Sequence, residues 1–251
     1  MTSTRKTALI AGVLFIITIV LSIPGALLYG PLLNDPDYIT GSGADTQIAL
    51  GAFLEIGVAI ANIGTAVVLF PILRRQNEAV ALGYVASRIV ESTLIAVGIL
   101  SLLSVVSLRQ DFAAGDGADA ASFLGAGDAL IALHAWTFLL GPGLLAASTG
   151  VLLGYLMFSS RLVPRWMALL GLVGGPIIFL SGIAVLFGVY DQVSVWSGLA
   201  TALEFAWEAS LGVYLIVKGF RPSPILREAE AAAEAKAAAR AAAGRVPQAA
   251  L

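Results

Sequence analysis

Residues 82–108 read LGYVASRIVESTLIAVGILSLLSVVSL, and this stretch decides the fold. It is almost wholly apolar and longer than the ~20 residues that a helix needs to cross the hydrocarbon core of a bilayer. It nevertheless carries Arg88 and Glu91. A charge inside a membrane helix costs about 3 kcal/mol even on insertion scales, so such residues turn toward the interior of a bundle and pair there. The stretch therefore predicts a membrane span that brings a charged pair to the centre of a larger helical assembly.

The composition of the whole chain supports a membrane protein. Of its 251 residues, 59% are hydrophobic and 12% are charged, and the mean hydropathy is +0.93. A soluble domain has about 25% charged residues. The net charge of −2 gives no basic field for a nucleic-acid partner. The absence of cysteine excludes disulfides and thiolate chemistry, and the single histidine, His134, excludes a multi-histidine metal site or a bis-histidine haem within one chain. No metal or cofactor is expected, and the bilayer is the expected partner.

Six apolar runs are long enough to span a membrane, which predicts an all-α polytopic protein with a six-helix transmembrane domain over residues 1–220. The fourth run is interrupted by Gly141-Pro142-Gly143, and a proline inside a helix predicts a kink. Glycines spaced four apart, at 150 and 154 and again at 171 and 175, would allow helices to approach closely. The expected spans cover residues 7–29, 48–73, 82–108, 130–158, 167–189 and 195–217.

Two further segments are expected to lie outside the bundle. Residues 109–128 are rich in Gly, Ala and Asp, and their composition predicts an external loop. Residues 221–251 form an alanine-rich tail in which Ser223-Pro224 predicts the start of a cytoplasmic helix that ends before Gly244. Two interpretations of this tail stay open, a solvated helix and a helix that binds a partner protein.

The distribution of charged residues predicts the orientation. Basic residues fall at alternate ends of the spans, and these ends are cytoplasmic by the positive-inside rule. The opposite ends carry one basic residue, Arg109, and all eight aspartates. Both termini are therefore expected in the cytoplasm, in agreement with an even number of spans. The basic residues that define the cytoplasmic side are Arg5, Lys6, Arg74, Arg75, Arg161, Arg165, Lys218 and Arg221.

Polar residues inside the predicted spans are the candidate functional site. Their spacing places those of each helix on one face, which must turn inward in a membrane. A further stripe, at 134, 141, 148 and 155, repeats every seven residues. The glutamates outnumber the one arginine, so some of the carboxyls must be protonated, hydrated or paired with something outside the chain. The expected cluster consists of Glu55, Asn62, Arg88, Glu91, His134, Glu204 and Glu208.

Two interpretations of this cluster remain open. Arg88, Glu91 and Glu208 could form a buried clamp that fixes helix packing, or the surplus carboxyls could line a cavity for protons or a small polar or cationic ligand. Glu204 lies farther from Arg88 and is expected to hold a proton. His134 is more often a packing residue than a proton relay.

Three classes of function follow from these interpretations. The first is a non-catalytic membrane protein with a sensing, partner-binding or structural role. The second is a proton-coupled transporter of a small molecule or ion that uses the buried glutamates. The third, an intramembrane enzyme, lacks support because no H-E-x-x-H motif, paired aspartate or Ser/His/Asp spacing occurs. A cavity that reaches Glu204 would favour transport over a structural role, and a homo-oligomer remains open.

Several motifs together resemble an uncharacterised family. They are KTALIAGVL at residues 6–14, RIVE at 88–91, LHA at 133–135, GYLMFSSRLVPR at 154–165, and the segment from Glu208 to Gly219. Over about residues 5–220 the chain resembles a family of bacterial, mainly actinobacterial, multi-pass membrane proteins known only as a domain of unknown function. The resemblance implies a protein of the bacterial cell membrane, and it implies no reaction, substrate or catalytic residue.

Overall fold

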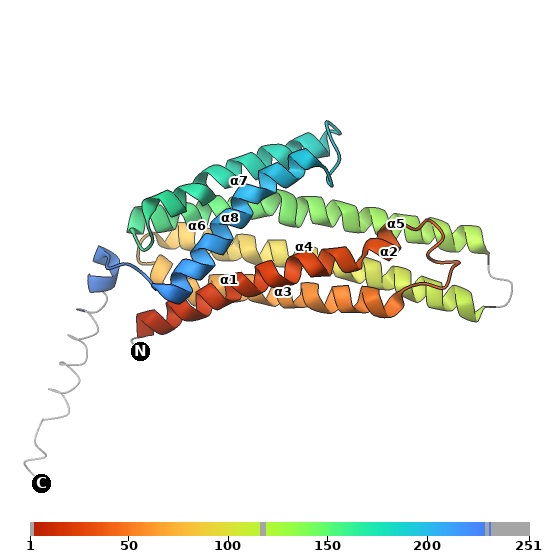
Figure 1. Cartoon of the computed structure of the whole chain (residues 1–251), viewed down its shortest axis with the longest axis horizontal. Coiled ribbons are helices and arrows are strands. Elements are labelled where there is room, and N and C mark those ends of the chain that lie inside the picture. The colour runs from red at the N-terminus through yellow and green to blue at the C-terminus, as the bar shows by residue number, and fades with distance from the viewer. Residues whose placement is uncertain (1–2, 116–118, 229–230, 232–251) are drawn as a thin grey trace, which may run out of the picture.

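The computed structural model describes residues 3–115, 119–228 and 231, and these residues contain no β-strand (Figure 1). The described part has six helices that are long and apolar enough to cross a membrane, which confirms the predicted all-α polytopic bundle. A short helix, α2 (Gly30–Leu33), follows the first span. The other spans outside the fourth are α1 (Ser3–Leu28), α3 (Asp45–Leu73), α4 (Glu78–Ala114), α7 (Arg165–Leu186) and α8 (Val195–Val217).

The fourth span is a continuous but irregular helix. It consists of α5 (Ala120–Phe138), the π-helical segment η1 (Leu139–Leu145) and α6 (Ala146–Ser160). The irregularity lies at the predicted place, because Pro142 has no N–H for the helical ladder and lies inside η1. A π-helical turn contains more residues than an α-helical turn, so it rotates the faces that follow it. The expected seven-residue stripe through Tyr155 is therefore wrong, and that side chain is 42% exposed.

The expected external loop over residues 109–128 is also wrong. Helix α4 continues to Ala114, and α5 begins at Ala120. Alanine is the strongest helix former and outweighs the scattered glycines. The carboxylate of Asp119 caps α5 by accepting a hydrogen bond from the N–H of Ala121, and the rings of Phe112 and Phe123 pack edge to face at 5.7 Å. The two helices thus extend as a pair beyond the other spans.

The spans pack as a ring. Helix α1 packs on α3, α3 on α4, α4 on α5, η1 and α6, α6 on α7, α7 on α8, and α8 returns to α1. Helix α8 crosses α1 near the N-terminal end of the chain and diverges from it toward the α7–α8 turn (Figure 1). At the crossing, a Cβ on Gly12 would lie 2.7 Å from the carbonyl oxygen of Gly212, so only glycine allows these backbones to touch. Side chains that point to the centre of the ring are therefore enclosed by several spans.

The glycine pairs in α6 and α7 have the role expected of them. A Cβ on Gly171 would lie 3.0 Å from the carbonyl oxygen of Gly150, and one on Gly175 would lie 2.7 Å from that of Ala147. A Cβ on Gly154 would lie 2.9 Å from the backbone nitrogen of Leu172. The two helices therefore meet backbone to backbone along this face.

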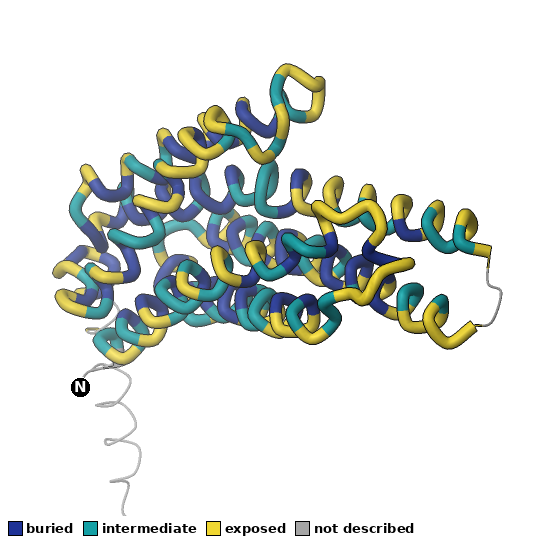
Figure 2. The backbone as a smooth tube through the Cα atoms, turned by 45° about the vertical axis from the view of Figure 1, so that its right-hand side comes forward, coloured by how far each residue is buried: buried dark blue, intermediate teal, exposed yellow. Residues whose placement is uncertain are grey.

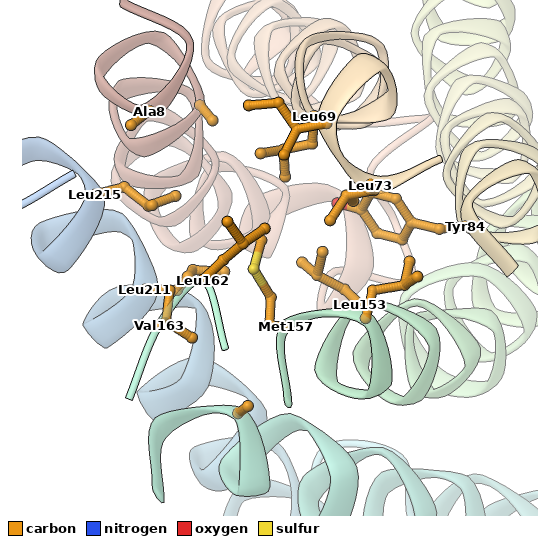
Figure 3. Close-up of a cluster of buried hydrophobic side chains, with 14 of the residues drawn as sticks. Ala8, Leu69, Leu73, Tyr84, Leu153, Met157, Leu162, Val163, Leu211 and Leu215 are labelled. Carbon is orange, nitrogen blue, oxygen red and sulfur yellow. The ribbon is translucent and has the colours of Figure 1, made fainter. Parts of the chain in front are cut away.

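Two clusters of buried apolar side chains fill the interior of the bundle, one toward each end of the helices. The inner cluster surrounds Leu69, Leu153, Met157 and Leu211, which converge from α3, α6 and α8 (Figure 3). The outer cluster contains Tyr29 and residues of the C-terminal half of α4, Leu102, Val105 and Val106. Exposed residues predominate at the far ends of α4 and α5 and in the α7–α8 turn. Along the spans, exposed and buried residues alternate (Figure 2). Helices α3 and α4 contribute to both clusters, and their residues Glu55, Asn62, Arg88 and Glu91 lie between the two clusters in sequence.

The start of the C-terminal segment belongs to the packed structure. Residues 224–228 are helical, and Ile225 and Leu226 join the inner cluster. The backbone N–H of Arg221 donates to the carbonyl oxygen of Leu162 at 2.8 Å. The remainder of the predicted alanine-rich helix, apart from residue 231, lies outside the described residues.

Candidate functional site

The arginine of the opening stretch is at the centre of the site. Arg88, which is 3% exposed, contacts Glu91 one turn along α4, with 3.3 Å between Nη1 and Oε2. Its Nη2 forms an ion pair with Glu208 of α8. Nη1 also donates to Oδ1 of Asn62 on α3 at 3.1 Å. One guanidinium therefore connects three helices, α3, α4 and α8, as an arginine with a planar fork of donors can.

A second layer of contacts orients this clamp. The amide of Asn62 lies 3.4 Å from Oε1 of Glu91, and the guanidinium of Arg88 lies 5.8 Å from the centre of the Tyr84 ring. The hydroxyl of Ser92 donates to the carbonyl oxygen of Ala59 at 3.3 Å and joins α4 to α3. These contacts fix the rotation of α4, so that Arg88 and Glu91 face the ring centre.

Glu204 occupies a different environment. Its side chain is 7% exposed, and its Oε2 has no hydrogen-bond partner among the described residues. The carboxyl lies against glycines of two neighbouring helices. A Cβ on Gly150 would be 2.6 Å from Oε1, and one on Gly174 would be 3.2 Å from Oε2. These glycines provide the space that the carboxyl fills, while no described side chain neutralises it.

A cavity of about 410 Å³ joins these groups. It lies between the two apolar clusters and is lined by α1, α3, α4, α5, η1, α6, α7 and α8. Its polar wall contains five ionisable side chains and one amide, namely Glu55, Asn62, Arg88, Glu91, Glu204 and Glu208. Six of the seven residues predicted from the sequence therefore line one cavity.

Apart from the hydroxyl side chains of Thr18, Ser22 and Thr201, the remaining wall of the cavity is apolar, and it reaches the surface of the bundle. Ile23 and Leu27 of α1 line it and are 52% and 72% exposed. Phe205 of α8 lines it as well and is 42% exposed. The cavity therefore opens between α1 and α8, on the side where these helices diverge, through a mouth of apolar side chains.

The seventh predicted residue, His134, does not line the cavity. Its Nδ1 lies 3.4 Å from the carbonyl oxygen of Gly98, and its ring packs against Tyr29 at 5.7 Å and Phe138 at 6.2 Å. Tyr29 in turn donates a hydrogen bond of 2.9 Å to Oε2 of Glu55. His134 thus supports the tyrosine that holds Glu55, which is a packing role.

A separate ion pair ties the end of the bundle opposite the chain's N-terminus. Arg109 pairs with Asp45 at the start of α3, and the hydroxyl of Tyr38 donates to the same carboxylate at 2.9 Å. Burial, together with this hydrogen bond, raises the pKa of Tyr38 to about 12. The pair joins the extended end of α4 to the start of α3, away from the cavity.

Some residues of the site were not predicted from the sequence. Thr18 and Ser22 of α1 line the cavity, and their spacing of four residues could have indicated a polar face of the first span. Tyr29 could not have been predicted in the same way, because an aromatic residue near a span end ordinarily anchors at the membrane interface. Among the described residues, no group of three or more His, Asp or Glu side chains could hold a metal ion.

Comparison with known proteins gives a family without an activity. A family model described as a domain of unknown function (DUF4386) matches residues 10–219. This range contains five of the six spans in full, most of the first span, and every residue that lines the central cavity. No curated protein and no solved structure matches the chain.

Proposed function

The chain belongs to the DUF4386 family, a domain of unknown function, and we propose that its central cavity binds a small, largely apolar cation and exchanges it for a proton. The observation that carries this proposal is the carboxyl of Glu204, which faces the cavity and has no partner for its Oε2 in the described part of the chain. A carboxyl in this position is available to a ligand.

The charge balance of the cavity selects for a cation. Arg88 contacts two carboxylates, those of Glu91 and Glu208, so the clamp alone carries one excess negative charge when all three groups are ionised. Glu55 and Glu204 add further acidic groups to the same walls. Uncompensated charge is costly inside a membrane protein, and a bound cation or bound protons would compensate it.

Size and access define the class of ligand further. The volume of about 410 Å³ lies within the ~300–1,000 Å³ typical of small-molecule sites. The apolar mouth formed by Ile23, Leu27 and Phe205 favours a ligand with an apolar body that arrives from the bilayer. A molecule with one amine or quaternary ammonium group on such a body matches both the mouth and the acidic wall.

Proton exchange follows from competition at Glu204. Without a ligand, the carboxyl keeps its proton, because no described cation lies against its Oε2. When a cation binds, the O–H bond breaks, the proton leaves to water and the carboxylate pairs with the cation. The charge of the cavity stays constant during this exchange, which would couple movement of the ligand to movement of a proton.

A structural or partner-binding role is the second candidate. It is favoured by the clamp, since Arg88 joins three helices irrespective of any ligand. The clamp does not account for Glu204 or for the cavity. The two candidates therefore differ in what they require of Glu204, and binding experiments distinguish them.

The test uses benzyltrimethylammonium, a permanent cation without a titratable proton, added to the purified protein in detergent at neutral pH. We expect calorimetry in buffers of different ionisation enthalpy to detect release of up to one proton per bound cation. Neopentylbenzene, a neutral molecule of the same shape, should bind without proton release. Glu204→Gln should abolish the release and weaken cation binding about tenfold, as loss of a charge-assisted contact does.

Glu78→Gln is the matched control, because Glu78 is an exposed glutamate at the start of α4, far along the helix from the cavity. This variant should bind benzyltrimethylammonium and release protons to the same extent as the unaltered protein. Absence of saturable binding of the cation, or proton release that persists in Glu204→Gln, would overturn the proposed function.

We also propose that both termini lie in the cytoplasm of a bacterial cell, since basic residues gather at the ends of the spans next to them. The chain has no cysteine, so single cysteines can be introduced without background. An impermeant thiol reagent should label Ser42→Cys in intact cells and should leave Glu78→Cys unlabelled. Both positions are exposed, so labelling reports the side of the membrane. Labelling of Glu78→Cys without labelling of Ser42→Cys would show that the orientation is the opposite of the proposed one.

A further inference from the structure

A second cavity lies at the end of the bundle where α1 begins and α8 ends. It has a volume of about 240 Å³ and is separated from the central cavity by the inner apolar cluster. Three basic side chains, those of Arg5, Lys218 and Arg227, line it together with Thr4, Ser223 and Leu226. We infer that this cavity is a binding site for a phosphate group.

Backbone carbonyl groups at the end of α8 hold the guanidinium of Arg5 in place. Arg5 donates from Nη1 to the carbonyl oxygen of Leu215 at 2.7 Å and from Nη2 to that of Ile216, at the C-terminal end of α8. Gly219 has φ of 75°, and a Cβ there would lie 3.2 Å from Nη1 of Arg5. The glycine thus permits both the turn and the close approach of the guanidinium.

The other two basic residues have no acidic partner in the described part of the chain. The ion pairs found there involve Arg88 and Arg109 and neither Lys218 nor Arg227. An anion between these two side chains and Arg5 would meet positive charge from three segments. A phosphate group carries one to two negative charges on several acceptor oxygens, which suits such a set of donors.

A buried hydroxyl provides independent evidence for a ligand. Ser223 lines the cavity and is 0% exposed, and its Oγ has no hydrogen-bond partner among the residues that the structure describes. A buried hydroxyl without a partner is costly, so a donor in this position is expected to meet an acceptor when the site is filled. A phosphate oxygen is such an acceptor.

The phosphate can come from two sources. The cavity lies where two spans end, the level of lipid headgroups, and basic pockets at this level bind anionic lipids. The lining residues Phe220 and Pro222, which are not buried, also present apolar surface to a lipid. Free inorganic phosphate would satisfy the same donors, and the experiment separates the two.

The experiment is native mass spectrometry of the purified full-length protein titrated with dioleoylphosphatidylglycerol or dioleoylphosphatidylcholine. We expect the anionic lipid to bind more tightly than the zwitterionic one. The double variant Lys218→Ala with Arg227→Ala should weaken its binding at least tenfold. Ser223→Ala should weaken it several-fold without lowering the melting temperature of the lipid-free protein, because it removes only an unpartnered hydroxyl.

The control is Arg74→Ala with Arg75→Ala, which removes the same charge from exposed positions at the same end of the bundle. If this control loses as much lipid affinity as the Lys218/Arg227 variant, the attraction is diffuse and the proposed site is wrong. The same conclusion follows if neither site variant changes binding. Inorganic phosphate that binds to the unaltered protein and displaces the lipid identifies free phosphate as the source, and lipid binding without such displacement identifies the headgroup. The site is independent of the proposed function.

Discussion

Arg88→Met is expected to destabilise the bundle by about 3–5 kcal/mol, the cost of removing one partner from a buried ion pair. Methionine keeps most of the side-chain volume, so the loss reports charge rather than a void. Without the guanidinium, the carboxylates of Glu91 and Glu208 lose their shared counter-charge, and Asn62 loses a donor. Titration with dodecyl sulfate in mixed micelles measures the free energy of unfolding. Arg75→Met, an exposed arginine on the same side of the bundle, should change it little.

A double-mutant cycle assigns the partner. Combining Arg88→Met with Glu208→Gln removes both halves of the contact between α4 and α8, so the double variant should be more stable than the sum of the two losses predicts. The same cycle with Glu91→Gln should give a smaller coupling, because Nη1 of Arg88 lies 3.3 Å from Oε2 of Glu91, farther than Nη2 lies from the carboxylate of Glu208. Strictly additive losses with Glu208→Gln would show that the contact between α4 and α8 contributes nothing to stability.

The clamp illustrates what the sequence could predict. A charge in an apolar span needs a partner, and few residues of opposite charge are available in the other spans. Glu91 lies one turn from Arg88, and Glu208 reaches a similar depth from the opposite side of the membrane. Depth along a helix follows from a fixed rise per residue, so positions in different spans can be matched without knowing how the helices pack.

Rotation about the helix axis and contacts between distant segments could not be predicted in this way. The space for Glu204 is formed by Gly150 and Gly174, which lie on two other helices. Which glycine faces a given carboxyl depends on the rotation of α6, and η1 changes that rotation within the same span. The helical ends of α4 and α5 depend on the contact between Phe112 and Phe123, which composition alone does not show.

The two glutamates of the cavity that are fully buried, Glu91 and Glu204, should respond to the same substitution in opposite directions. Glu91→Met removes a carboxylate that pairs with Arg88 and Asn62, and should destabilise the protein by about 1–3 kcal/mol. Glu204→Met replaces a carboxyl whose Oε2 has no partner in the described structure, by an apolar side chain of similar length. Removing an unsatisfied buried polar group should stabilise the protein by a similar amount.

This difference in sign tests whether Glu204 is kept for stability or for binding. Unfolding in mixed micelles gives the change in the free energy of unfolding for both methionine variants. Infrared spectroscopy of the unaltered protein at neutral pH should show a protonated-carboxyl band that is absent in Glu204→Gln. A residue retained only to hold the helices together would cost stability when it is removed, as Glu91 does. If Glu204→Met destabilises the bundle as much as Glu91→Met, Glu204 has a partner and a structural role. If it stabilises the bundle while cation binding is lost, the unpaired carboxyl serves the ligand at the expense of the fold.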